Sequence, residues 1–554
     1  MRIEYLQFLQ GANTQISPFL MGDDMLEVQD NVVTSHKLGA ILKRPGYSQV
    51  GGALDAKPIT GLHNFRQSSA TQKMLATCNS SDGADTELFY YTDTSTTVDV
   101  ESASGQKVVS VASTTGFIAG DIVILAKGYT NEETKVIDTI SVGVSITLTE
   151  NLTNTHAENV VVEQSWTNIT LSTTWDGYED TTVEMEDYLG YCFFVGYGAT
   201  DGFLPTMTFT GTTTVSETTN ITNAPQAKFI KRYRDRLYMI NLYDGGALPY
   251  RVGISDAPVA GSIGWTEYQA GTGFIDVDYS EGLIGGGVNW DRLMLFTEYS
   301  AYMYDQSTKK KVWDVGCSNH RTIKNSGAYM IWANQDGVWM STGGRPQNIA
   351  GRVLDFIKGS TPSAMFAEVV DEEYHLYVGN VTVNGISYSN CSLIYNIPTQ
   401  TWRWHEYHDG IEIFARYNDS GDDRLYMGTT DGEVMNLGKY TDGTLVNSDD
   451  GNDIQAFFRT KPFDFGMADK HKRLIEMTAF SNRAQGLQLK SRIINKNSGD
   501  LIKPKPLMQL NKYIETATPK VEQGELLQIE GVEVGQNPYF SLYGFSMDVE
   551  LATK

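Results

Sequence analysis

Two histidines lie close together in the run WRWHEYHDG, where they are a candidate pair of metal ligands. His405 and His408 are the only close pair among eight histidines. Imidazole nitrogens bind zinc when further ligands and a helix or tight loop hold them. The aromatic neighbours favour a strand edge instead. No C-x-x-C pair is formed by the four cysteines, Cys78, Cys192, Cys317 and Cys391. We therefore expect no metal site, and free buried thiols in a reducing compartment.

An acidic loop and a glycine-rich run are candidates for ion and phosphate binding. The loop Asp276–Gly282 carries Asp276, Asp278 and Glu281, but the full calcium-loop pattern is missing. The glycine run Gly282–Gly287 leads into a strand pattern, so it presents no helix N-terminus to a phosphate. Neither a P-loop nor a G-x-S-x-G elbow is present. We expect no cofactor and no catalytic residue.

The run ISDAPVAGSIGWTEY at Ile254–Tyr268 resembles the Ser-x-Asp…Trp turn of sialidase-like propellers. That turn shapes a hairpin even in sialidases, whose chemistry needs an arginine cluster, a tyrosine nucleophile and a carboxylate. No pattern assigns the nearby arginines to one cluster: Arg232, Arg234, Arg236, Arg251 and Arg292. The run therefore predicts a propeller and not an enzyme.

Acidic residues outnumber basic ones by 67 to 43, which gives a net charge of −24. Tight non-specific binding of nucleic acid needs a basic surface, so this balance argues against it. We expect the short basic stretches to be solvated or paired with acidic neighbours: Lys228–Arg236, Lys309–Lys311 and Lys470–Arg473. No signal peptide pattern opens the chain, and no apolar run approaches the ~20 residues of a membrane helix. We expect a cytoplasmic product without a membrane anchor.

A strand pattern that returns about every 40–55 residues organises the middle of the chain. It is seen in YRDRLYMIN at Tyr233–Asn241, NWDRLMLFTE at Asn289–Glu298 and GDDRLYMGTTDGEVMNLG at Gly421–Gly438. Asp-Gly turns at Asp336-Gly337 and Asp431-Gly432 predict hairpins. One such unit cannot bury both faces of its sheet, so several must stack around an axis. The pattern predicts a β-propeller from residues 50–95 and 164–445.

Three other segments complete an all-β chain. Residues 1–49 hold little periodic pattern but many apolar anchors, so we expect an extended N-terminal arm that packs on the propeller or on a neighbouring subunit. Residues 96–163 are rich in Thr, Val and Ser, which predicts an inserted small β-barrel or sandwich module. Residues 454–554 carry well-separated strand runs, which predict a C-terminal β-sandwich.

The order of these motifs resembles the packaged-DNA stabilisation proteins of short-tailed bacteriophages, also called tail hub, nozzle or tail tubular proteins. The shared features are an arm that ends in Arg44-Pro45-Gly46, the propeller run Ile331–Gly344 and the FFRTKPFDFG start of the sandwich. The inserted module lies outside the common pattern. The resemblance implies a structural virion protein of the tail, not an enzyme, which is assembled in the host cytoplasm.

In that family the chains form a homo-oligomeric ring, usually a hexamer, below the portal and adaptor. The ring joins them to the distal tail and lines or closes the channel through which double-stranded DNA passes transiently. An acidic lumen keeps DNA sliding, since each phosphate contact is an energy well. Candidate lumen loops are the acidic stretches Asp176–Asp187, Asp276–Glu281, Asp419–Asp423 and Asp449–Asp453.

The surplus of aromatic residues leaves two other classes of function open. One is a propeller-type adhesin or tail-fibre component that binds host glycans, and the other is a glycan-cleaving propeller. An adhesin binds cells as an isolated protein, an enzyme releases sugar, and a hub forms a stable ring.

Overall fold

Strands dominate this computed structural model of the chain. The longest helix in the described part, α2, spans only Leu354–Gly359. The expectation of an all-β chain is therefore confirmed. None of the helices in that part is long and apolar enough to cross a membrane.

The structure describes residues 2–5, 8–35, 39–68, 71–80, 85–169, 175–178, 181–211, 215–216, 221–259, 261–419, 422–438, 440–441, 444–467, 470–482, 486–494, 504–519, 523–535 and 540–551.

The chain divides into two compact units. The first comprises Met1–Ser48, Lys324–Asp409 and Leu437–Lys554, and the second comprises Gln49–Ile323 and Gly410–Asn436. Each unit is therefore assembled from segments that are far apart in the sequence.

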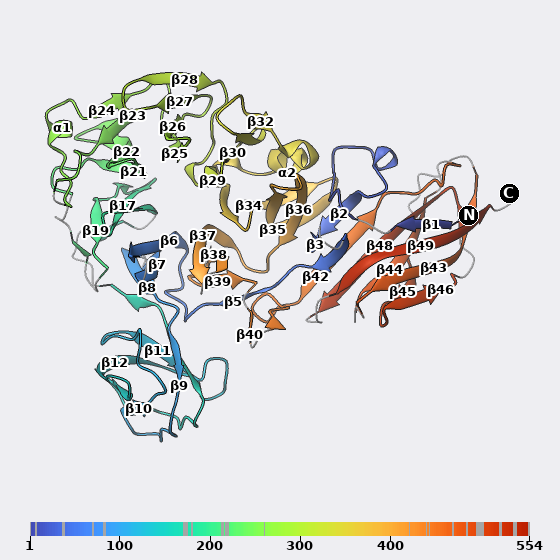
Figure 1. Cartoon of the computed structure of the whole chain (residues 1–554), viewed down its shortest axis with the longest axis horizontal. Helices are drawn as coiled ribbons and strands as arrows, with labels where there is room; N and C mark the ends of the chain where they lie inside the picture. Colours follow the sequence, from blue (N-terminus) through green and yellow to red (C-terminus); the bar gives the residue numbers. More distant parts are fainter. Residues whose placement is uncertain are drawn as a thin grey trace. The chain divides into compact units, whose positions relative to one another are not determined.

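Unit 2 is a succession of antiparallel sheets whose strands follow chain order (Figure 1). The strands that build them are β6 (Ile59–Ser68), β7 (Thr71–Asn79) and β8 (Thr86–Tyr91); β16 (Thr182–Tyr188), β17 (Tyr191–Gly198) and β19 (Met207–Phe209); β21 (Gln226–Tyr233), β22 (Arg236–Tyr243), β23 (Ala247–Ile254) and β24 (Phe274–Asp276); β25 (Gly285–Asn289), β26 (Arg292–Phe296), β27 (Ala301–Tyr304) and β28 (Lys309–Trp313); and β37 (Ile411–Asp419), β38 (Asp422–Thr429) and β39 (Val434–Leu437). The opening strands of these sheets lie side by side, since β6 contacts β16 and β37, and β21 contacts β16 and β25.

A separate sheet is built entirely from residues 95–164 of unit 2. Its strand order is β10-β13-β12-β11-β14-β9, and its core is a cluster of aliphatic side chains such as Val123, Ile146 and Val162. The strands are β9 (Ser95–Thr97), β10 (Val108–Ser110), β11 (Ile122–Leu125), β12 (Glu133–Ser141), β13 (Ser145–Leu148) and β14 (Val161–Gln164). Ser95 and Glu163 are direct partners in the β9–β14 ladder, so the two ends of the segment are adjacent.

Polar contacts attach this module to the sheet from which it emerges. The Tyr90 hydroxyl donates a hydrogen bond of 2.6 Å to Asp121 in the module, and the Lys73 Nζ lies 3.9 Å from the centre of the Tyr90 ring. Burial raises the pKa of both Asp121 and Tyr90. The attachment is thus a small polar contact area beside a core that the module completes alone.

Unit 1 contains two large sheets that combine strands from both ends of the chain. The nine-stranded sheet runs β33-β34-β35-β36-β2-β42-β48-β44-β45, and the main path of the seven-stranded sheet runs β3-β4-β49-β43-β46. A four-stranded sheet is formed by β29 (Lys324–Ser326), β30 (Tyr329–Asn334), β31 (Gly337–Ser341) and β32 (Gln347–Asn348).

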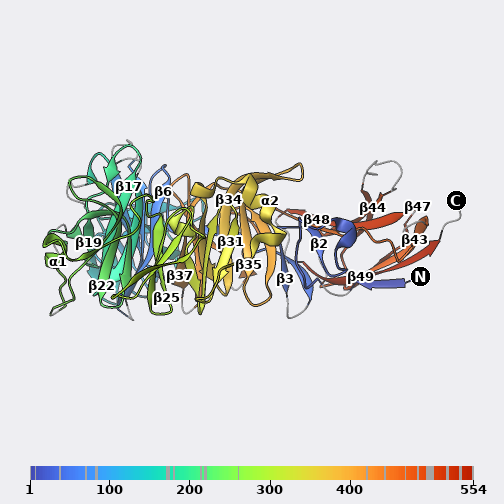
Figure 2. The same cartoon turned by 90° about the horizontal axis from the view of Figure 1, so that it is seen from above.

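The other strands of unit 1 are β1 (Arg2–Tyr5), β2 (Leu26–Asp30), β3 (Val32–Ser35), β4 (Ala40–Lys43), β33 (Phe366–Val370), β34 (Glu373–Val383), β35 (Ile386–Asn396), β36 (Thr401–Glu406), β42 (Ile454–Thr460), β43 (Lys472–Ser481), β44 (Gln488–Ile494), β45 (Lys505–Gln509), β46 (Ile514–Ala517), β48 (Leu526–Gly535) and β49 (Ser541–Leu551). Figure 2 shows β44 and β48 on one side of unit 1, and β43 and β49 on the other. Side chains from both pairs meet in one core with Phe8, Leu26 and Ile41.

The N-terminal segment differs from the expected extended arm of residues 1–49. β2 pairs antiparallel with β42, while β1 and β4 both pair with β49. The reason is that β42 and β49 would otherwise have unpaired backbone groups along one edge, and β2 and β4 supply the missing partners. Among the described residues of this segment, Phe19 and Leu20 are strongly exposed apolar anchors, at 57% and 79%.

We predict that the module can be removed without unfolding unit 2. Deleting residues 96–163 and joining Ser95 to Gln164 by a short Gly/Ser linker should shift the unfolding temperature by only about 5 °C, because the lost contacts are few. Differential scanning calorimetry would measure the shift, with Tyr90→Phe in the full chain as the matched control for the lost hydroxyl contact. Aggregation of the shortened protein would show that the module is part of the main core.

Candidate functional site

His405 and His408 do not converge on a common ligand position. His405 is buried on β36 at 2% exposure, whereas His408 is exposed in the turn that follows. Burial lowers the pKa of His405 well below its ordinary value, and the neighbouring Arg403 guanidinium adds to the effect. Within the described residues, neither histidine belongs to a group of three or more metal-ligating side chains. The pair is therefore a neutral core imidazole next to a surface one.

The acidic and glycine-rich stretches have local structural roles. Asp276 forms a two-point ion pair with Arg251 at 2.7 and 2.8 Å, and Asp278 accepts the Ser280 N–H. Gly285, from the glycine run, belongs to strand β25, and a Cβ there would lie 2.3 Å from the His320 ring. The acidic loop thus holds no convergent set of free carboxylates. Gly285 is needed because a side chain there would clash with the His320 ring.

The Ser-x-Asp…Trp turn also has a structural role. Asp256 accepts the backbone N–H groups of Thr266 and Glu267 at 2.8 and 2.9 Å, which fixes the start of the short helix α1 (Thr266–Gln269). Trp265 is buried at 1% exposure. The nearby arginines pair with different carboxylates, since Arg234 binds Asp291, Arg236 binds Glu267 and Arg251 binds Asp276. Those three arginines do not form the cluster that a sialidase needs.

A partly buried ionic cluster lies where the opening strands of unit 2 meet, with the Arg321 and Glu184 side chains each 15% exposed. Arg321, from the short helix His320–Thr322, donates to Glu184 at 2.8 Å and to the carbonyls of Thr60 and Val183 at 2.7 and 3.1 Å. His320 accepts the Gly286 N–H, and its ring centre lies 4.6 Å from that of Phe229. These residues belong to β6, β16, β21 and β25 and the helix.

The charged groups of the Arg321 cluster are already paired with one another and with backbone carbonyls. Burial alone would raise the pKa of the Glu184 carboxyl, but Arg321, His320 and Lys231 outweigh it and hold that pKa at about 2. A ligand would have to displace a guanidinium whose hydrogen bonds are already made, at a cost of several kcal/mol. The cluster is therefore a structural tie between strands and not an open binding site.

Arg44 of the Arg-Pro-Gly motif is the centre of a second buried network, in unit 1. Its side chain is 1% exposed and binds both oxygens of Asp449, one of them at 2.8 Å. It also donates to Asn31 Oδ1 at 2.7 Å and to the Glu406 carbonyl at 2.6 Å. Burial opposes the charge, yet Asp449 raises the pKa of Arg44 above its ordinary value. One guanidinium thus connects the N-terminal segment to two segments, at Glu406 and Asp449, that lie hundreds of residues further along the chain.

Two further acidic side chains adjoin the Arg44 network. Burial, followed by the neighbouring Glu406 carboxylate, raises the pKa of Asp30 well above its usual range. The Tyr47 hydroxyl donates to Asp409 at 2.7 Å, and burial with Asp449 nearby raises the pKa of Tyr47. Asp449 was a candidate for an acidic channel lining, and its burial at 2% exposure corrects that prediction. The Asp449 carboxylate forms an ion pair with Arg44 instead.

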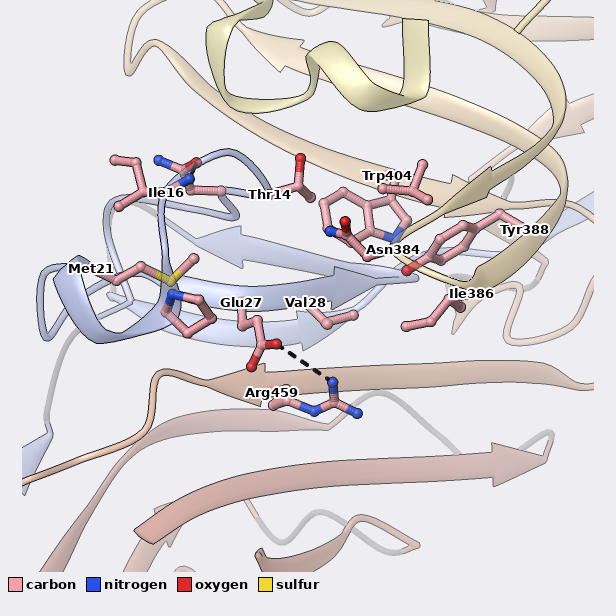
Figure 3. A pocket seen from close by; sticks show the side chains of 13 residues that line it. Thr14, Ile16, Met21, Glu27, Val28, Asn384, Ile386, Tyr388, Trp404 and Arg459 are labelled. Carbon is pink, nitrogen blue, oxygen red and sulfur yellow. Dashed lines mark hydrogen bonds and ion pairs between the residues drawn. The ribbon is translucent and has the colours of Figure 1, made fainter. Parts of the chain in front are cut away.

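A pocket of about 140 Å³ opens in unit 1 beside the N-terminal segment (Figure 3). Its apolar lining includes Val28, Tyr388 and Trp404, and its polar lining includes the Glu27–Arg459 ion pair, whose atoms are 3.8 Å apart. The Trp404 indole N–H is buried and has no hydrogen-bond partner among the described residues. The pocket therefore combines aromatic faces with a spare donor, a combination suited to a small polar ligand or side chain.

Sequence reasoning singled out Arg44 but missed Arg321, Glu184 and the pocket. Glu184 carried a readable signal, since it is an acidic residue within the strand run TVEMEDY and a buried strand carboxylate needs a partner. Arg321 lies in a one-turn helix far from its partners in sequence, so no local pattern points to it. The pocket is lined from several separate segments, which pattern analysis does not bring together.

Comparison with known proteins adds no relative to this picture. Neither the protein-family models nor the curated protein sequences give a match to this chain.

We predict that breaking the Arg44–Asp449 pair destabilises unit 1 strongly. Arg44→Ala leaves a buried carboxylate unpaired and should cost about 3–5 kcal/mol in the free energy of unfolding. The double variant Arg44→Met with Asp449→Leu removes both charges and should recover much of that loss. Denaturant unfolding measures both, with Arg473→Ala at the exposed Arg473–Glu550 pair as a control that changes stability little. Equal losses in the single and double variants would contradict the argument.

We predict that Glu184 makes unit 2 sensitive to acid. Because its pKa is lowered from the ordinary 4.5 to about 2, its contribution is fully present above pH 4.5 and is lost as the pH falls through 2. That contribution is about 3 kcal/mol. Glu184→Gln should therefore be less stable than the native protein at pH 7, with a smaller further loss at pH 3.

Denaturant unfolding at the two pH values measures this difference. Glu267→Gln, at the more exposed Arg236–Glu267 pair, is the matched control and should keep the native pH dependence. An unchanged acid response in Glu184→Gln would show that another group carries it.

Proposed function

We propose that this chain is a structural virion protein, a tail hub or nozzle ring of a short-tailed bacteriophage. The observation that carries the proposal is a run of consecutive antiparallel meander sheets between an N-terminal segment ending in Arg44-Pro45-Gly46 and a strand-rich C-terminal segment. That order is the one in which the sequence resembles the hub proteins. The buried contacts of Arg44 explain the motif in structural terms, since its side chain connects the N-terminal segment to Glu406 and Asp449.

The finer fold in this proposal is a β-propeller with an inserted β module and a C-terminal β-sandwich. In a propeller the first strand of each blade lies next to the axis, and the opening strands of the unit 2 sheets are neighbours in this way. In unit 1, the sheets β29–β32 and β33–β36 follow the same antiparallel meander. Sandwich-like packing is supported by strands of two sheets that share the core around Phe8 and Phe545.

The proposal assigns the chain no enzymatic role. Among the described residues, two of the motifs that suggested chemistry are occupied by a helix cap at Asp256 and an ion pair at Asp276. Catalysis needs polar groups that converge on an open position, and the Arg321 cluster is filled by the chain itself. No cofactor is part of the proposal.

In the proposed assembly several copies, expected as a hexamer, form a ring that joins the portal and adaptor to the distal tail. The ring lines or closes the channel through which double-stranded DNA leaves the virion. The net charge of −24 per chain supports this role, because an acidic lumen repels phosphates and leaves few binding minima along the path. Assembly takes place in the host cytoplasm.

A second candidate function is a glycan-binding adhesin, and the pocket beside Trp404 is the observation that favours it. Aromatic faces with a free N–H donor are suited to stacking on a sugar ring and binding its hydroxyl groups. The pocket is small, however, and Arg459 is already engaged by Glu530 at 2.8 Å. A hub function accounts for more of the chain than this one pocket does.

We predict that the purified protein forms a closed ring and binds duplex DNA only weakly. Native mass spectrometry should give one multiple of the 61.4 kDa chain, and DNA affinity should vanish by about 0.15 M salt. Isolated protein should not bind host cells, whereas an adhesin would, with loss of binding in Trp404→Ala. A monomer that binds cells, or tight salt-resistant DNA binding, would overturn the hub proposal.

A further inference from the structure

Three side chains of different ligand type meet in unit 2, apart from the clusters described above. His63, Asp187 and Cys192 place one ligand atom each so that all three lie within 4.8 Å of one another. The His63 Nε2 is 2.8 Å from the Asp187 Oδ1. Within the part of the chain that the structure describes, this is the single group of three such residues that meets this distance.

The hairpin β16–β17 holds two of these residues in fixed register. Asp187 and Cys192 are direct cross-strand partners, one pair away from a two-residue turn at Leu189 and Gly190. Both turn residues have positive φ, 54° and 79°, the conformation that a tight hairpin turn requires. Side chains of directly opposed residues project to the same face of the sheet, so the carboxylate and the thiol are held side by side.

The third residue comes from the neighbouring sheet. His63 lies on β6, which is a neighbour of β16. Asp187 also accepts the Arg66 backbone N–H with its Oδ2 at 2.9 Å. This second bond fixes the carboxylate and turns its Oδ1 toward His63, in the way that outer hydrogen bonds orient metal ligands.

We propose that His63, Asp187 and Cys192 bind a zinc-class transition metal ion that cross-links the first two sheets of unit 2. Ligand atoms of a tetrahedral zinc site stand roughly 3.3–3.8 Å apart, given metal–ligand bonds of about 2.0–2.3 Å. The three atoms here need to move only a little to reach that spacing. Imidazole, thiolate and carboxylate together select Zn²⁺ or Co²⁺ over Ca²⁺ and Mg²⁺, which take oxygen ligands.

The burial of the three side chains suits this occupant. His63 and Asp187 are about one-quarter exposed, at 26% and 28%, so an ion can enter from solvent on their side. Cys192 is fully buried and closes the other side. Three protein ligands leave the fourth tetrahedral position to a water molecule on the open side. On binding, the metal replaces the thiol proton of Cys192 and the contact between His63 and Asp187, and the thiol proton is released to solvent.

The inserted module supplies a matched site without a thiol. His156 Nε2 lies 2.7 Å from Glu133 Oε1, a contact of the same kind as that between His63 and Asp187. No cysteine accompanies it within the described residues, and the Glu133 oxygens also accept backbone N–H groups of Thr153 and Asn154. A histidine–carboxylate contact alone is therefore common in this fold, and the added thiol makes the His63 group different.

The experiment uses the full chain and Co²⁺ as a spectroscopic probe. Titration should bind about one Co²⁺ per chain, with the tetrahedral visible bands and a thiolate-to-cobalt charge-transfer band, and Zn²⁺ should displace it. Cys192→Ser should abolish the charge-transfer band, and His63→Ala should weaken binding by at least about tenfold. Zn²⁺ should raise the unfolding temperature of the native protein and not that of Cys192→Ser.

Two controls separate this site from general metal binding. His156→Ala and Cys317→Ser remove a histidine and a buried thiol elsewhere in unit 2 and should leave the cobalt spectrum unchanged. His63→Cys keeps a metal ligand and should retain binding even if His63→Ala is unstable. Absence of a charge-transfer band in the native protein, or its persistence in Cys192→Ser, would overturn the proposal and leave the three residues as a hydrogen-bonded group. Neither result would bear on ring formation.

Discussion

Unit 1 depends on the buried ion pair between Arg44 and Asp449. A guanidinium at 1% exposure is tolerated only where all its donors are satisfied, and here a carboxylate, an amide oxygen and two carbonyls do so. The groups come from the N-terminal segment, the end of β36 and the stretch before β42. No one of these segments can complete the network alone. The ion pair therefore links the N-terminal segment to the end of β36 and to the stretch before β42.

The pairing of β2 connects the same segments through a sheet, in addition to the contacts of Arg44. β2 lies between β36, its parallel neighbour, and β42, its antiparallel neighbour. Arg44 and Asn31, which flank β3 and β4, bind the Glu406 backbone at the end of β36. The sheet that carries the C-terminal strands thus continues into β33–β36 through a strand from the N-terminus. The predicted boundary at residue 454 does not coincide with a break in this sheet.

The sequence predicts features that depend on neighbouring residues, but not contacts between residues that are far apart in the chain. Alternating residues and turn residues are local, so strands such as β30 and β31 could be predicted, although their turn is Gln335-Asp336, one residue before the expected Asp336-Gly337. The same alternation shows which face of β2 is buried but not which strand it pairs with, because any unpaired edge satisfies its backbone. Arg321 and His63 act on partners more than a hundred residues away. Their roles appear only when the sheets are assembled.

The basic stretches show how local pairing decides what a charged surface can bind. In Lys228–Arg236, Lys231 faces Glu186, Arg234 binds Asp291 and Arg236 binds Glu267. Lys472 of the stretch Lys470–Arg473 is buried at 4% exposure, with its ammonium held by the carbonyls of Met467, Lys470 and Glu525.

A DNA clamp needs several cations that are free to contact successive phosphates, and each cation already paired with a carboxylate contributes little to such binding. Because acidic residues outnumber basic ones, many carboxylates have no basic partner even when every cation is paired. Repulsion of a duplex is then the collective result of many weak surface charges, which persists within the ~8 Å Debye length of physiological salt. A surface of this charge therefore disfavours tight binding of duplex DNA.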